Sequence, residues 1–162
     1  MKNLVKKLMV IVVCVLISQT AITQNKYASV NFSTGKAVTD GISGINMSGN
    51  LEDRYDDSYH LKLLRGEYLD LSFNIPMNSP SGKIELKHLT SGAGGSDGYS
   101  PVTLYVNNNQ VTSWKNLGQG YTTDAVDISK FLTRGTNTIR LKYSDADGSS
   151  GYWIKFVHIY TW

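Results

Sequence analysis

A glycine-rich stretch, TSGAGGSDGYSPVTLYV, looks more like a chemical motif than any other part of the chain. Glycine-rich loops bind phosphate when their backbone amides lead into the N-terminus of a helix. Here the stretch leads into the alternating run PVTLYV, no Gly-Lys-Ser/Thr follows, and Pro101 removes one amide donor. We interpret it as a long connection between two strands, which carries Asp97 and Tyr99 near its end.

Two clusters of acidic side chains raise the question of calcium, a metal that prefers oxygen ligands. The clusters are LEDRYDDSY, around Asp53, and SDADGSSGY, which contains Asp145. Counted from Asp145, the second cluster has Ser150 where an EF-hand loop needs glycine, and Phe156 where it needs glutamate. An EF-hand is therefore excluded. A structural calcium ion is the metal we expect if the protein holds one, and no ligand residue is assigned to it.

The three histidines, His60, His88 and His158, form no pattern that is typical of catalysis or zinc binding. His88 and His158 each fall on an apolar strand face, where a hydrogen-bonded structural histidine is the usual explanation. A pair of carboxylates at the separation of a glycosidase is not decided by the sequence. Jelly-roll polysaccharide lyases use Tyr, His and Arg on a concave face, and all three types are present here, but no spacing selects a set of them. We therefore expect no enzymatic activity and assign no catalytic residue.

Alternating hydrophobicity along the chain predicts β-strands. The run YLDLSFNIP has polar residues on one face and, on the other, Leu69, Leu71, Phe73 and Ile75. KIELKHL, PVTLYV and NTIRLKY alternate in the same way, whereas YWIKFVHIY is apolar on both faces, as in a central strand. One short helical turn is expected in DISKFLTRG, capped by Asp127 and ended by Gly135. Many short strands and no long helix predict an all-β, antiparallel β-sandwich.

Residues 1–23 have the layout of a secretory signal peptide. Three lysines precede an apolar core of about ten residues, which is too short to span a bilayer as a helix. We expect cleavage near Gln24. The remaining residues, 24–162, then form a single domain of 139 residues, which is long enough to bury a core.

Removal of this leader would also remove the only cysteine and the excess of positive charge. Cys14 lies inside the leader, so neither a disulfide nor a thiolate metal site would stabilise the mature chain. The full sequence has 16 Lys and Arg against 13 Asp and Glu, and three of the lysines belong to the leader. A balanced charge gives no electrostatic reason to expect nucleic acid or an anionic membrane as a partner. We expect a secreted or cell-surface protein that is not inserted in the membrane after cleavage.

Three stretches of the sequence together resemble a known family. They are Val106-Asn107-Asn108 at a strand end, Asp127-Ile128 with Phe131-Leu132 in a short turn, and GTNTI at the start of a strand. This pattern is similar to that of the galactose-binding-like jelly roll, which occurs in carbohydrate-binding modules of families 6 and 35. The resemblance covers roughly residues 59–160 and implies a jelly-roll β-sandwich.

The resemblance also implies that loops at the edge of the sandwich recognise sugars. In such sites an aromatic face stacks on the sugar ring, while nearby polar groups hydrogen-bond to its hydroxyls. On this ground the candidate ligand-binding residues are Trp114, Tyr121, Tyr99, Asp97 and Asn107. The tyrosines and Asn107 also have a structural explanation, because tyrosines pack across strands and consecutive asparagines suit the positive φ angles of a hairpin.

The function that we expect is therefore that of a secreted, non-catalytic, lectin-like protein that binds a glycan or polysaccharide. One alternative is a structural or adhesive surface protein that binds other proteins, and a less favoured one is a small polysaccharide lyase or hydrolase. Exposed aromatic residues on one surface would favour a sugar, and a flat apolar patch would favour a protein partner. A cleft that joins His, Tyr and Arg would favour catalysis.

Overall fold

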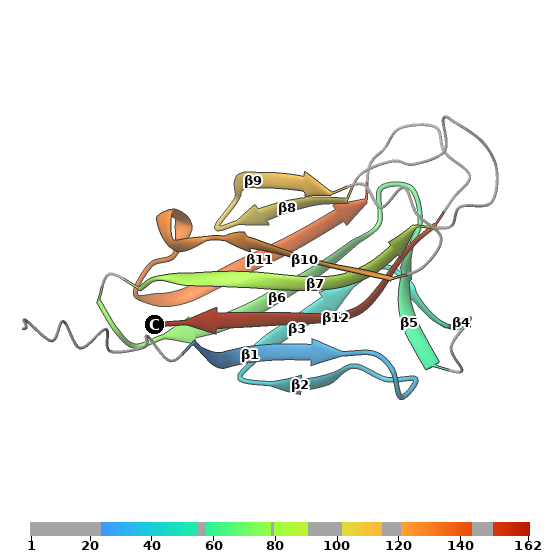
Figure 1. The fold of residues 1–162 in the computed structure, drawn as a ribbon, viewed down its shortest axis with the longest axis horizontal. Helices are drawn as coiled ribbons and strands as arrows, with labels where there is room; N and C mark the ends of the chain where they lie inside the picture. The colour runs from blue at the N-terminus through green and yellow to red at the C-terminus, as the bar shows by residue number, and fades with distance from the viewer. Residues whose placement is uncertain (1–23, 55–57, 79, 91–101, 115–120, 144–150) are drawn as a thin grey trace, which may run out of the picture.

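The computed structural model describes residues 24–54, 58–78, 80–90, 102–114, 121–143 and 151–162, which form two antiparallel sheets packed face to face (Figure 1). The predicted all-β sandwich is therefore confirmed. The one helical element in these ranges is a short 3-10 turn, η1 (Ser129–Phe131). None of the residues described provides a helix long and apolar enough to cross a membrane.

Sheet A has seven strands in the order β10-β7-β12-β1-β2, with β5 paired to both β12 and β4. These strands are β1 (Asn25–Asn31), β2 (Val38–Asp40), β4 (Asn50–Arg54), β5 (Ser58–Leu63), β7 (Gly82–Thr90), β10 (Thr122–Asp127) and β12 (Tyr152–Thr161). Strand β12 pairs with β7 on one side and with β5 and then β1 on the other. The prediction that YWIKFVHIY is a central strand is confirmed.

Sheet B has five strands in the order β3-β6-β11-β8-β9. They are β3 (Gly44–Met47), β6 (Tyr68–Ile75), β8 (Val102–Val106), β9 (Asn109–Trp114) and β11 (Gly135–Tyr143). In Figure 1 this sheet lies behind sheet A. Its middle strand, β11, pairs over most of its length with β6 and over its second half with β8.

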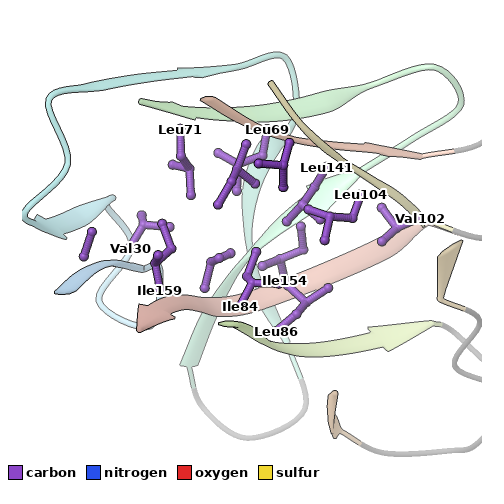
Figure 2. Close-up of a cluster of buried hydrophobic side chains, with 14 of the residues drawn as sticks. Val30, Leu69, Leu71, Ile84, Leu86, Val102, Leu104, Leu141, Ile154 and Ile159 are labelled. Carbon is purple, nitrogen blue, oxygen red and sulfur yellow. The ribbon is translucent and has the colours of Figure 1, made fainter. Parts of the chain in front are cut away.

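The inward faces of the two sheets form one hydrophobic core. The inward residues of β6, including Leu69 and Leu71, are fully buried, as the alternation of that segment predicts. Figure 2 shows them in the same cluster as Leu104 and Leu141 of sheet B and as side chains from sheet A such as Ile154. Removal of this apolar surface from water is the main force that holds the sheets together.

A β-bulge explains why β12 is apolar on both faces. The pairing of β12 with β7 shifts register between Ile154 and Phe156, and one extra residue reverses the alternation there. Tyr152 and Ile154 therefore point inward before the bulge, and Val157 and Ile159 point inward after it. On the outer face of sheet A lie the aromatic side chains of Trp153, Phe156, His158 and Tyr160.

The turn before β11 differs from the prediction at one residue. Asp127 accepts a 2.7 Å hydrogen bond from the backbone N–H of Ser129, which supports its predicted place at the start of the turn. Gly135 does not end the turn, because Leu132 is already extended, at φ −78° and ψ 145°. Instead Gly135 begins β11 with φ +93°, a conformation that glycine adopts readily.

Candidate functional site

Of the site residues predicted from the sequence, the structure describes Trp114, Tyr121 and Asn107, and these do not lie together at one end of the sandwich. Trp114 is paired with Val102 at the end of β9, and Tyr121 directly precedes β10. Asn107 follows β8 at the other end of that strand. Asp97 and Tyr99 lie outside the described residues. The structure therefore does not bring Asn107 together with Trp114 and Tyr121.

The side chain of Trp114 is partly buried and packs against the hydrophobic core. Its ring lies 6.2 Å from the ring of His88, which is fully buried. His88 Nε2 is 2.6 Å from a carboxylate oxygen of Asp124, and its Nδ1 is hydrogen-bonded to the hydroxyl of Tyr152. Burial lowers the pKa of His88, against the opposing effect of Asp124, and burial also raises the pKa of Tyr152. The prediction that His88 is a hydrogen-bonded structural histidine is confirmed.

Tyr121 lies on a different surface from Trp114, on the outer face of sheet A. Its ring stacks on that of buried His60, with centroids 4.8 Å apart and an interplanar angle of 14°. The Nζ atoms of Lys87 and Lys155 lie 5.6 and 5.5 Å from the Tyr121 ring centroid. Trp114 and Tyr121 therefore do not form one aromatic surface, and ligand contact by either remains a prediction.

The side chain of Asn107 is occupied within the fold. Its Nδ2 donates to the backbone oxygen of Phe131 at 2.8 Å and to Oδ1 of Asn137 at 2.9 Å. Its Oδ1 accepts a 2.8 Å hydrogen bond from the backbone N–H of Thr138. The residue has φ 49°, as expected for an asparagine in a tight hairpin turn. This geometry favours the structural explanation for Asn107 over ligand binding.

A groove on the outer face of sheet B was not predicted from the sequence. It has a cavity volume of about 410 Å³. Its lining comes from β3, β6, β11 and β8 and from the turn after β8, so the groove crosses the strands. The lining residues are Gly44, Ile45, Asn46, Asp70, Ser72, Tyr105, Asn108, Thr138 and Arg140.

One wall of the groove is a row of directly paired residues. Asn46 is opposite Asp70, Asp70 is opposite Arg140, and Arg140 is opposite Tyr105. Asp70, Tyr105 and Arg140 belong to strands whose alternate residues point into the core, so these three side chains point to solvent, and Asn46 is an exposed residue of β3. Cross-strand partners lie close together on one face, so the register places an amide, a carboxylate, a guanidinium and an aromatic ring side by side.

The floor of the groove is hollow because the neighbouring row is made of small residues. Gly44 is opposite Ser72, and Ser72 is opposite Thr138. A Cβ atom placed on Gly44 would lie in ordinary van der Waals contact with that of Ser72, at 3.5 Å, so the absence of a side chain on Gly44 leaves this space open. Small side chains beside longer ones therefore produce a depression on the sheet.

The two charged side chains that line the groove, Asp70 and Arg140, form an ion pair with each other. Nε and Nη2 of Arg140 each donate a 2.7 Å hydrogen bond to one of the two carboxylate oxygens of Asp70. The hydrogen bond to Asp70 is the main cause that raises the pKa of Arg140. The ring of Tyr68 lies 4.9 Å from Cζ of Arg140, and its hydroxyl accepts a 3.2 Å hydrogen bond from Asn46. These contacts hold the guanidinium in one orientation.

Sequence patterns alone could not find this groove. The pattern of YLDLSFNIP and NTIRLKY places Asp70 and Arg140 on outward faces, which is typical of ordinary solvated residues. Their proximity depends on the pairing register of β6 and β11, and the third contributor, β3, has no strong alternating pattern. The nearest signal in the sequence is the alternation of opposite charges with aromatic residues on predicted outward faces.

Comparison with known proteins places this architecture among solved structures. No family model and no curated protein matches the sequence. A family 35 carbohydrate-binding module from an environmental isolate matches with a TM-score of 0.55, at 19% identity, over 81% of this chain and 90% of the module. The Xyl-CBM35 module, solved with a glucuronic acid containing disaccharide, matches with a TM-score of 0.54, at 16% identity, over 74% of this chain and 86% of that one.

A third match is module CBM36 in complex with calcium and xylotriose, with a TM-score of 0.51, at 17% identity, over 72% of this chain and 98% of the module. The chain has the jelly-roll fold of carbohydrate-binding modules. At these identities the likeness establishes this jelly-roll fold alone, and the ligand must be argued from the surface of the chain itself.

The structure also bears on the expected calcium ion. Within the part of the chain described, no group of three or more His, Cys, Asp or Glu side chains is arranged to hold a metal. Glu52, from the first acidic cluster, instead forms a 2.8 Å ion pair with Lys62. Asp56, Asp57, Asp145 and Asp147 lie outside the described residues. The described acidic side chains therefore form no carboxylate cluster for calcium, and the ion stays a prediction without assigned ligands.

Proposed function

We propose that this protein is a non-catalytic glycan-binding protein and that the groove on sheet B contacts the glycan. The observation that carries the proposal is the row Asn46, Asp70, Arg140 and Tyr105, which borders an open hollow. The fold gives independent support, because modules that share it were solved with xylotriose and with a glucuronic acid containing disaccharide.

The groove has the chemistry that sugar recognition requires. The ring of Tyr105 offers an aromatic face to the C–H groups of a pyranose, and the neighbouring polar groups offer donors and acceptors to its hydroxyls. A volume of about 410 Å³ lies within the range of ordinary small-ligand sites. The groove is open and crosses several strands, which suits a segment of a chain better than a fully enclosed monosaccharide.

The alternative functions receive less support from the same surface. The groove contains Tyr105 and Arg140 but its lining has no histidine, and its one carboxylate, that of Asp70, is held in an ion pair. The exposed large apolar side chains among the described residues are dispersed over several elements: Val38, Ile45, Tyr59, Leu64 and Met77. No described strand contributes more than one of these side chains, so their distribution gives no support to a flat apolar docking patch.

Two further expectations rest on the sequence alone. Secretion rests on the leader-like residues 1–23, and recognition by edge loops rests on the family resemblance. Trp114 and Tyr121 flank residues 115–120, so an edge-loop site would adjoin them. The edge-loop site is a separate hypothesis from the groove, and the variants below distinguish the two.

The experiment is a glycan-array screen of residues 24–162, followed by calorimetric titration with the best ligand. Tyr105→Ala removes the aromatic face, and Ser72→Tyr fills the hollow from the solvent side. We expect each change to weaken binding about tenfold or more, equivalent to about 1.4 kcal/mol. Tyr59→Ala is the matched control, because Tyr59 is an exposed tyrosine of sheet A, and it should bind normally.

Failure of the groove hypothesis would be clear. If both groove variants fold and bind like the unaltered protein, while Trp114→Ala or Tyr121→Ala abolishes binding, the glycan site lies at the edge loops. If a folded sample binds no glycan on the array, the proposed function itself is wrong.

A further inference from the structure

We infer that the groove selects uncharged glycans and that Asp70 is the residue that sets this selectivity. The inference rests on the proposed function, since it concerns the ligand class of the same groove. It is carried by the geometry of the Asp70–Arg140 pair and by the composition of the lining.

The only charged side chains that line the groove are Asp70 and Arg140. Both 2.7 Å hydrogen bonds between them use the same edge of the guanidinium, so the pair is bidentate. The side chain of Asp70 is 25% exposed and that of Arg140 is 50% exposed, so a ligand can reach both. Among the lining residues, the negative charge of Asp70 therefore already neutralises the positive charge of Arg140.

An anionic sugar would meet an unfavourable arrangement in this groove. A carboxylate that approached Arg140 would also approach the carboxylate of Asp70, and like charges at short range repel. Displacing Asp70 would break a bidentate pair whose guanidinium is also held against the ring of Tyr68. Lys142, which is opposite Tyr68, lies further along β11 and does not line the groove.

An uncharged sugar would find complementary groups. The guanidinium edge away from Asp70 retains N–H donors, and the Asp70 oxygens retain lone pairs that can accept from hydroxyls. Donor and acceptor lie next to each other, which suits two adjacent hydroxyl groups on a sugar ring, one accepting and one donating. Asn46 extends the same row with an amide.

One isosteric substitution in the groove is expected to change its specificity. Asp70→Asn keeps the size and one acceptor oxygen but removes the negative charge, which leaves Arg140 available to a ligand carboxylate. We expect the variant to gain affinity for acidic glycans by about tenfold relative to neutral ones, the effect of one charge-assisted hydrogen bond.

The test uses pairs of ligands that differ in charge but hardly in size. One pair is an oligogalacturonate trimer and its methyl ester, and the other is a xylo-oligosaccharide that carries one glucuronic acid and the methyl ester of the same compound. We expect the unaltered protein to bind the uncharged member of a pair about tenfold more tightly at low salt, where charge effects are largest. Asp40→Asn makes the same change in net charge on exposed strand β2 of sheet A and should leave the ratio unchanged.

The outcomes separate this inference from the proposed function. If the unaltered protein binds the acidic member as tightly as the neutral one, and Ser72→Tyr abolishes that binding, the groove binds glycans but is not selective. An unchanged ratio in a folded Asp70→Asn sample also overturns the inference. If neither pair is bound but the array yields another neutral ligand, its uronate should bind about tenfold more weakly, and equal binding of the two overturns the inference. Absence of all glycan binding overturns the proposed function and this inference together.

Discussion

Asn107 donates a 2.9 Å hydrogen bond from Nδ2 to Oδ1 of Asn137, which joins the turn after β8 to the first residues of β11. Asn137 is completely buried, and its amide also donates to the backbone oxygens of Thr133 and Gly135. The two asparagines therefore belong to the stretches that carry the resemblance to the galactose-binding-like family. Their contacts explain why these stretches predict the fold without identifying the ligand.

The first prediction concerns the stability of this turn. Asn107→Gly should lower the free energy of unfolding by about 2–3 kcal/mol, because it removes the three shortest hydrogen bonds of that side chain, at 2.8, 2.9 and 2.8 Å, which are worth roughly 1 kcal/mol each. Asn108→Gly is the matched control, since Asn108 also has a positive φ, 66°, but an exposed side chain. Urea denaturation of both variants measures the difference. Equal losses would mean that backbone conformation, rather than the Asn107 amide, stabilises the turn.

The second prediction separates a structural role of Tyr121 from a ligand-binding role. Tyr121→Ala should lower the free energy of unfolding by about 1–2 kcal/mol, because the ring covers His60 and lies beside Lys87 and Lys155. Tyr121→Phe keeps the ring and should retain the stacking. Thermal unfolding and glycan titration of both variants give the answer. Unchanged stability with lost sugar binding in Tyr121→Ala would favour the edge-loop site.

The third prediction is a loss of stability in mild acid. Burial lowers the pKa of both His88 and His158 from the usual value of 6.5, so the unfolded chain takes up these protons at a higher pH than the folded chain. The stabilising contribution is therefore complete above pH 6.5 and decreases as the pH falls below it, by at most about 1.4 kcal/mol per pH unit for each proton.

Urea denaturation between pH 7.5 and 5.5 measures this slope, and NMR titration of the histidine ring signals assigns it. His158→Gln should reduce the slope without removing it, because His88 remains. A normal titration of His88 at or above pH 6.5 in the folded protein would contradict the explanation.

The fourth prediction concerns metal removal. Treatment with EGTA should leave glycan affinity at the groove unchanged, because Asp70 is the only carboxylate in its lining and calcium requires several oxygen ligands. Titration with and without EGTA, followed by addition of calcium, measures this directly. Loss of groove affinity that calcium restores would show that the groove depends on a metal. A fall in Tm alone would indicate a calcium ion elsewhere in the chain.

The extent to which the sequence predicts this fold varies with the strand. The strict alternation in β6 and β11 predicts both the strand and its buried face, because such a pattern cannot be buried on one side of a helix. Strands β2 and β3 are short and mostly exposed, so burial leaves little periodic signal in them. Their places depend on partners distant in sequence.

The predictions of individual site residues were limited by the same non-local information. Trp114 and Tyr121 are close in the chain, but one ring packs on His88 between the sheets and the other on His60 outside sheet A. Residue type predicts that an aromatic ring needs a partner, whereas the sheet topology decides which one. The pairing of Asp70 with Arg140, 70 residues apart, is an example that only the register reveals.

The place of β12 in sheet A has a consequence for how the protein folds as it is made. This strand follows all the others in the chain, yet β7, β5 and β1 all hydrogen-bond to it. Until Tyr152–Thr161 has left the ribosome, those three strands lack their common neighbour in sheet A, although every strand of sheet B has already been made. Sheet A is thus expected to be completed only after synthesis of this strand, and the mostly long-range pairing makes folding slow compared with that of a helical bundle of the same size.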